Sequence, residues 1–268
     1  MLLHGLGSFR QAWDPVIPAL AAVADVVAVD LPGFGDSPAL PEGVEPSPAA
    51  LALAVAGLLD ELGLEMPHVA GNSLGAWVAL ELAAVRPVAS LTLLSPPGLW
   101  PEGTPLYCRV SLRASWWLAR HARRPIDAVV GTRAGRGVVL GQILGRPGRM
   151  SPAQARAGIH ALADAPGFEA VLRATAHRRY QAPHEIDVPT TLAFGSRDRL
   201  LISRRWRRVD ELPAGTRVAA LPGCGHVPMT DDPAAVAALV AAPLSGAGRV
   251  PASQGSAERP EPRSVPRA

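Results

Sequence analysis

Short apolar segments that predict β-strands alternate with helical segments along most of this chain, and this alternation limits its possible folds more than any other feature. Strands are expected at 25–30, 67–72, 90–95, 190–195 and 217–221, which are rich in small and β-branched residues. Helices are expected after Ser47, over 74–85, after Ser203 and after Asp232. Strands that alternate with helices predict an α/β fold, with a mainly parallel sheet covered by helices on both faces.

Two parts of the chain depart from this alternation. Residues 99–183 show no strand pattern and are helical and rich in arginine, which predicts a helical insertion on the sheet. After Leu244 the composition changes to Ser, Gly, Pro, Arg and Glu, which predicts a disordered tail over 245–268. The α/β core is therefore expected in two pieces, 1–98 and 184–244.

Composition excludes several protein classes. The chain has 268 residues, of which 48% are hydrophobic, so it can bury a core without disulfides or metals. The two cysteines, Cys108 and Cys224, are too few for a disulfide framework. The net charge is +3 and every basic side chain apart from histidine is arginine, but no nucleic-acid-binding module accompanies them, so no nucleic-acid partner is expected.

The same composition argues against a membrane partner. The longest apolar run, 49–59, stops at Asp60 and is too short to span a bilayer. The first residues lack the basic segment of a secretory signal. We therefore expect a cytoplasmic protein with no membrane partner.

A G-x-S-x-G pattern at 71–75 places Ser73 where a predicted strand meets a predicted helix. A turn this tight needs small flanking residues, and it points a helix N-terminus at the serine hydroxyl, where negative charge can develop. The alternative interpretation is an ordinary strand-to-helix turn with a capping serine. The context favours a nucleophilic serine.

A nucleophilic serine needs a base, and the base needs a carboxylate. His226 follows a predicted strand on a glycine-rich loop and is the best placed of the seven histidines, while His4 is expected to make structural hydrogen bonds. Asp198 follows the strand at 190–195, at the edge where open α/β sheets bind ligands. The alternatives for the carboxylate are Asp30, Asp36, Asp231 and Asp232, and Asp198 itself could instead form a surface ion pair with Arg197 or Arg199.

Taken together, the order Ser73, Asp198, His226 resembles the α/β-hydrolase superfamily over residues 2–242. Further motifs that carry the resemblance are His-Gly-Leu-Gly at 4–7, Asp-Leu-Pro-Gly-Phe-Gly-Asp-Ser at 30–37 and Gly-His at 225–226. The resemblance implies an α/β-hydrolase fold in which 99–183 is a cap over the pocket. It also implies an oxyanion hole formed by the backbone N–H groups of Leu6 and Leu74, with no cofactor and no metal.

The family usually begins with further strands before the His-Gly motif, whereas here only Met-Leu-Leu precedes it. Either this start is wrong, or the sheet has an exposed edge that would favour a homo-oligomer. Gly-Asn-Ser-Leu-Gly is similar to the same motif in hydrolases of ring-cleavage products, which break a carbon–carbon bond in diketo acids. That similarity would make Asn72 a substrate contact and assign a substrate carboxylate to an arginine of the insertion. The candidate arginines are Arg109, Arg113, Arg120 and Arg124.

The similarity to carbon–carbon hydrolases is incomplete, because Val227 stands where that group usually has tryptophan. The serine also argues against haloalkane dehalogenases and epoxide hydrolases, which use aspartate. The sequence therefore predicts a serine hydrolase acting on a small-molecule carboxylic ester or related acyl substrate. Carbon–carbon hydrolysis, acyl transfer and a non-catalytic receptor that uses the same pocket are the alternatives.

Overall fold

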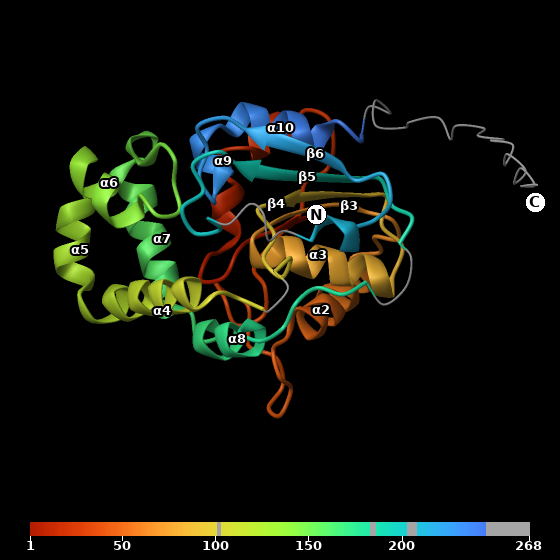
Figure 1. Cartoon of the computed structure of the whole chain (residues 1–268), viewed down its shortest axis with the longest axis horizontal. Helices are drawn as coiled ribbons and strands as arrows, with labels where there is room; N and C mark the ends of the chain where they lie inside the picture. The colour runs from red at the N-terminus through yellow and green to blue at the C-terminus, as the bar shows by residue number, and fades with distance from the viewer. Residues whose placement is uncertain (101–102, 183–185, 203–207, 245–268) are drawn as a thin grey trace, which may run out of the picture.

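A computed structural model describes residues 1–100, 103–182, 186–202 and 208–244. Its centre is one sheet of six parallel strands in the order β2-β1-β3-β4-β5-β6 (Figure 1). The strands are β1 (Leu2–Leu3), β2 (Ala28–Val29), β3 (His68–Asn72), β4 (Ser90–Leu94), β5 (Thr190–Gly195) and β6 (Arg217–Leu221). The parallel α/β sheet that the sequence pattern predicts is confirmed.

Helices cover both faces of the sheet (Figure 1). On one face, α2 (Pro48–Glu61) packs against α3 (Leu74–Val85), which in turn contacts β1, β3 and β4. On the other face, α1 (Ile17–Ala21) packs against α10 (Pro233–Ala241), next to the short α9 (Pro228–Asp231). Short 3₁₀ helices lie at Arg10–Trp13, Pro147–Arg149 and Val209–Glu211. Each face thus has its own apolar core, built largely from leucine, valine and alanine.

Between β4 and β5 the described residues form five helices, and residues 106–175, which contain them, are here called the helical insertion. They are α4 (Leu106–His121), α5 (Arg123–Val130), α6 (Arg133–Leu140), α7 (Pro152–Asp164) and α8 (Phe168–Thr175). Helices α4 to α7 stand beyond the carboxyl ends of the strands (Figure 1). A small apolar cluster of their own, which includes Val130, Leu144 and Ile159, holds them together.

Local signals in the sequence explain where several elements begin. The Ser47 Oγ accepts a hydrogen bond from the Ala50 N–H at 3.2 Å and so caps α2, and Asp232 caps α10 in the same way through the Ala235 N–H. Proline follows each of these caps at the first helical position. The helix expected after Ser203 and the tail expected at 245–268 lie outside the described residues.

One strand is shorter than expected. The apolar run at 25–30 predicts a buried strand, but only Ala28–Val29 is in strand β2, and both residues are half-buried. The physical reason is that β2 lies at the edge of the sheet and its single neighbour, β1, pairs with it over two residues only. The β-branched run therefore has the propensity to form a strand, but the strand stays short because a neighbouring strand pairs with only two of its residues.

Candidate active site

Ser73 occupies a strained turn between β3 and α3. Its backbone angles are φ 54° and ψ −121°, a region that residues other than glycine rarely adopt. The turn brings the backbones close together: a Cβ at Gly75 would lie 2.3 Å from the Leu3 carbonyl oxygen, and one at Gly71 would lie 2.3 Å from the Gly75 carbonyl oxygen. The two glycines of the motif are therefore required by packing, and this close packing holds the strained serine at the end of the sheet.

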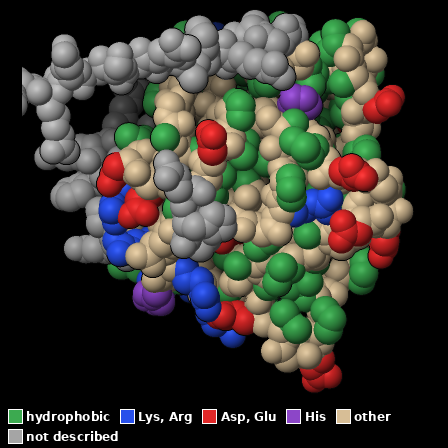
Figure 2. All heavy atoms as spheres, turned by 90° about the vertical axis from the view of Figure 1, so that its right-hand side faces the viewer, with side chains coloured by type: hydrophobic (Ala, Val, Ile, Leu, Met, Phe, Trp, Pro, Cys, Tyr) green, Lys and Arg blue, Asp and Glu red, His purple; other side chains and the backbone are tan. Residues whose placement is uncertain are grey.

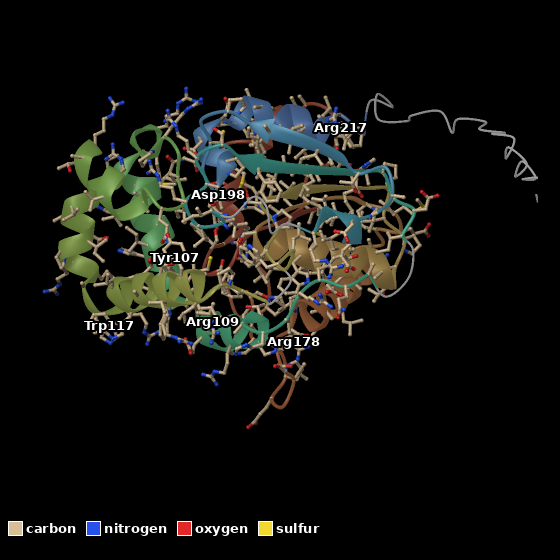
Figure 3. The ribbon with its side chains drawn as sticks, viewed as in Figure 1. Tyr107, Arg109, Trp117, Arg178, Asp198 and Arg217 are labelled. Carbon is tan, nitrogen blue, oxygen red and sulfur yellow. The ribbon has the colours of Figure 1, made fainter. Side chains whose placement is uncertain are left out.

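The structure brings Ser73, His226 and Asp198 together, although they are far apart in the chain. The Ser73 hydroxyl lies 2.8 Å from His226 Nε2, and His226 Nδ1 lies 2.9 Å from Asp198 Oδ2. Asp198 stands where the end of the sheet meets the insertion (Figure 3). The side chains of His226 and Asp198 are 4% and 1% exposed, so this chain of hydrogen bonds is shielded from water.

Asp198 is held as a carboxylate by its neighbours. Burial alone would raise the pKa of the carboxyl group, but the charge interaction and hydrogen bond with His226 and hydrogen bonds from the backbone outweigh it, so the pKa is lowered. The backbone donors are the N–H groups of Leu200 and Leu201, both directed to Oδ1 at 2.9 and 2.8 Å. They leave Oδ2 for the imidazole and fix the orientation of the carboxylate.

The N–H groups of Leu6 and Leu74 were expected to form an oxyanion hole. Among the described residues neither N–H has a hydrogen-bond acceptor. Leu74 is the first residue of α3, where backbone N–H groups have no partner within the helix. Gly5 brings the loop of Leu6 to the serine, since a Cβ on Gly5 would lie 3.1 Å from the Ser73 Cβ. The two N–H groups thus belong to the residue after Ser73 and to the residue after Gly5, which approaches Ser73.

The buried His4 side chain fixes the loop of Leu6 by hydrogen bonds to the backbone. The Leu31 N–H donates to His4 Nε2 at 3.0 Å, so Nδ1 carries the proton and donates to the Gly5 carbonyl oxygen at 2.8 Å. The side chain is fully buried, and burial lowers the pKa of the imidazole to about 4. His4 therefore stays neutral at physiological pH, with both ring nitrogens used for structural hydrogen bonds.

Asn72, which was expected to contact substrate, lines the cavity beside Ser73 and also has partners within the protein. Its amide nitrogen donates to the carbonyl oxygens of Leu94 at 3.2 Å and His226 at 2.9 Å, and the side chain is buried. Both amide hydrogens are thus used within the protein. Asn72 positions the loop of His226 against the end of β4, a role that the similarity to ring-cleavage-product hydrolases does not indicate.

The other aspartates that could have served His226 have different partners. Asp30 and Asp36 both bind the Arg10 guanidinium. Asp231 is fully buried, and its carboxylate accepts hydrogen bonds from the N–H groups of Gly225 at 2.7 Å, Gly145 at 2.8 Å and Arg146 at 2.6 Å. It therefore ties the residue next to His226 to the insertion.

Glycines make this junction between the insertion and the His226 loop unusually tight. A Cβ on Gly225 would lie 2.5 Å from the Ile143 carbonyl oxygen, and one on Gly145 would lie 2.2 Å from the Gly223 carbonyl oxygen. The Val227 N–H also donates to the Ile143 carbonyl oxygen at 3.0 Å. The loop that carries His226 thus has its position set by the insertion as well as by the sheet.

A cavity of about 960 Å³ lies above Ser73 and extends into the insertion. This is at the upper end of the usual range for ligand cavities, roughly 300–1,000 Å³. Most of its lining is apolar, with Leu112, Ile126, Val139, Ile159, Leu162 and Phe168 among the side chains. Within the described residues no arginine lines it, and its one carboxylate side chain is Asp14.

The arginines proposed to hold a substrate carboxylate lie elsewhere. Arg113 pairs with Glu169, and Arg120 donates to the Ala163 carbonyl oxygen and lies over the Trp116 ring. Arg109 and Arg124 do not line the cavity. The sequence interpretation of these residues as carboxylate ligands is therefore not supported by their positions.

Three further side chains, Trp116, Trp117 and Cys224, do not lie at the reacting centre. Trp116 stacks on Phe168, whereas Trp117 is exposed. Cys224 is buried, which raises the pKa of its thiol to about 11, and it contacts a backbone carbonyl. Across the described ranges, no group of three or more His, Cys, Asp or Glu side chains is arranged to hold a metal ion.

Comparison with known proteins finds relatives that are named as hydrolases. A sequence model of the alpha/beta hydrolase family matches residues 1–239. Epoxide hydrolase EphH of Mycobacterium tuberculosis is 32% identical over 202 residues, which are 72% of this chain and 93% of that protein. A pimeloyl-acyl-carrier-protein methyl ester esterase of Neisseria meningitidis is 32% identical over 251 residues, 89% of this chain and 74% of that protein. The crystal structure of a bacterial membrane phospholipase A is similar at a TM-score of 0.71 and 27% identity, over 91% of this chain and 77% of that one.

Proposed function

Because the chain belongs to the alpha/beta hydrolase family, we propose that it is a serine hydrolase that cleaves carboxylic esters through an acyl-enzyme. The observation that carries this proposal is the buried hydrogen-bond chain from Ser73 through His226 to Asp198. A neutral imidazole that donates from Nδ1 to a carboxylate presents an acceptor at Nε2 to the serine hydroxyl. Those are the protonation states that a serine nucleophile requires.

In this mechanism the Ser73 Oγ attacks the ester carbonyl carbon while His226 Nε2 takes the hydroxyl proton. The oxyanion that forms accepts hydrogen bonds from the N–H groups of Leu6 and Leu74. His226 then protonates the leaving alkoxide oxygen as the C–O bond breaks, and the acyl group remains on Ser73. A water molecule, deprotonated by His226, attacks this acyl group, releases the carboxylic acid and restores the serine.

The chemistry of the cavity favours a substrate with a neutral, apolar acyl chain. Its lining is mostly aliphatic, and Asp14 would repel a substrate carboxylate. The part of the cavity lining that the structure describes has no arginine to bind the carboxylate of a diketo acid, which argues against carbon–carbon cleavage. The esterase relative from N. meningitidis is named for an ester substrate, in line with this choice. Although another relative is named an epoxide hydrolase, residue 73 of this chain is serine rather than aspartate.

The substrate class is tested by rates on p-nitrophenyl esters of increasing acyl length, with Ser73→Ala as the blank. Burial of each added methylene in the cavity contributes about 0.8 kcal/mol, so kcat/KM should rise by up to about fourfold per methylene from acetate to octanoate. An ester of the same length that ends in a carboxylate should react more slowly. Faster hydrolysis of the carboxylate-bearing ester, or of a ring-cleavage diketo acid, would contradict the proposed substrate.

A further inference from the structure

The outer side of α4 is an apolar stripe on a helix whose other side is buried. Cys108 and Ala119 face the interior, whereas Leu106, Val110 and Trp117 are 69%, 56% and 54% exposed. Spacing of four and seven residues places these three on one face of the helix. Trp117 lies along the side of α4 away from the sheet (Figure 3). Apolar side chains gathered on one helix face in this way indicate an interaction surface.

Arginines run beside this stripe. Arg109, Arg113 and Arg120 share the adjacent face of α4, and no acidic residue lies on this helix. The side chains of Arg109 and Arg124 form no ion pair or hydrogen bond with any residue that the structure describes. Figure 3 shows Arg109 on the same side of α4 as Trp117. The surface therefore combines exposed apolar side chains with uncompensated positive charge.

Charge is distributed unevenly between the insertion and the rest of the chain. Residues 106–175 contain eleven arginines and three carboxylates, while the whole chain has a net charge of +3, so the remainder is net negative. The face turned away from the insertion displays acidic side chains, together with some basic ones, scattered among hydrophobic ones (Figure 2). An anionic surface would therefore attract the molecule with the insertion, which includes α4, foremost.

The cavity opens close to the same helix. Leu118 of α4 and Val138 of α6 both line the cavity, yet they are 47% and 83% exposed, so they mark its mouth. Leu118 follows Trp117 directly in α4. A lipid molecule in a membrane that contacts the outer face of α4 would thus lie near the entrance of the cavity above Ser73.

We propose that the outer face of α4 docks on an anionic lipid surface, with Leu106, Val110 and Trp117 entering the interfacial region and the arginines contacting lipid phosphates. An exposed helix face that carries Trp and Leu, with arginines beside them, has the composition of helices that lie in a membrane interface. The expectation of no membrane partner relied on the length of apolar runs, which tests only for spanning segments. No helix in the described ranges is long and apolar enough to cross a membrane, and docking needs none.

The test is co-sedimentation of the full-length Ser73→Ala protein with vesicles of phosphatidylcholine alone or mixed with phosphatidylglycerol. We expect binding to the mixed vesicles that weakens as salt is added, and little binding to the neutral ones. Changing both Val110 and Trp117 to serine should weaken binding at least about tenfold, because both side chains would enter the interface. Val218→Ser, which alters an equally exposed valine on β6, should leave binding unchanged.

Tryptophan emission provides a direct readout of insertion, since brominated lipids should quench the Trp117 component and not the buried Trp13 and Trp77. Equal binding to both kinds of vesicle, or unchanged binding of the double serine variant, would overturn the docking proposal. A stable dimer in solution that this variant dissociates would also overturn it and assign the face to a second copy of the chain. Because the serine nucleophile is absent from the protein used, none of these results depends on ester hydrolysis.

Discussion

Asp198→Asn is expected to lower kcat/KM for a p-nitrophenyl ester by about 10⁴-fold while the protein stays folded. Leu200 and Leu201 donate to Oδ1 of Asp198, so the new side chain keeps its oxygen toward them and turns its NH₂ toward His226. An NH₂ facing Nδ1 makes that nitrogen the acceptor and moves the imidazole proton to Nε2. A protonated Nε2 cannot accept the proton of Ser73, which lies 2.8 Å away.

The measurement is the steady-state rate at neutral pH, with Asp60→Asn as the matched control. Asp60 is an exposed aspartate that pairs with Arg86 far from the cavity, so its amide should behave like the parent. Melting curves of both variants check that the fold is intact. If Asp198→Asn retains activity within a few-fold of the parent, then Asp198 does not set the tautomer of His226 and another carboxylate must do so.

Asp231→Asn is expected to destabilise the protein by about 3 kcal/mol and to lower its melting temperature by roughly 10 °C. The carboxylate of Asp231 accepts three backbone N–H groups in a fully buried site. An asparagine in either orientation places its NH₂ against at least one of those N–H groups and leaves it without an acceptor. The cost arises because a buried donor loses its partner.

The same substitution should reduce kcat more than it raises KM, by about 10- to 100-fold, because Gly225 is bonded to Asp231 and precedes His226. Asp232→Asn is the control, since asparagine caps a helix as well as aspartate does and Asp232 caps α10. Thermal melts and initial rates on both variants give the comparison. If the Asp231→Asn protein has the melting temperature and the kcat of the parent, then the hydrogen bonds of Asp231 do not position the loop of His226.

Local patterns in the sequence predict much of this fold. Several predicted elements agree with the structure because each depends on neighbouring residues in the chain. They are the helix at 74–85, the strands at 190–195 and 217–221, and the caps at Ser47 and Asp232. The run at 25–30 was overestimated because strand length depends on a partner, and β1 offers two residues. Pairing partners are distant in the chain, so periodicity alone does not indicate them.

The candidate site was predictable only where its residues have a local sequence signature. The glycine motif around Ser73 and the loop of His226 have local signatures, and their meeting follows from a parallel sheet whose strands all end at one edge. Asp231 has no such signature, since two of its three donors come from the insertion, about eighty residues earlier in the chain. The use of Asn72 within the protein, and the outward position of Trp117, likewise depend on tertiary contacts that spacing does not reveal.

Reaction with a fluorophosphonate tests most directly whether Ser73 is an activated nucleophile. Phosphonylation displaces fluoride and needs a serine whose proton His226 can accept, so it reports the reactivity of the hydroxyl without knowledge of the natural ester. Mass spectrometry of the digested protein should find one phosphonyl group, on the peptide that contains Ser73, and none in the Ser73→Ala protein. A folded parent protein that remains unlabelled, or that is labelled equally at another serine, would contradict a serine-hydrolase mechanism at this site.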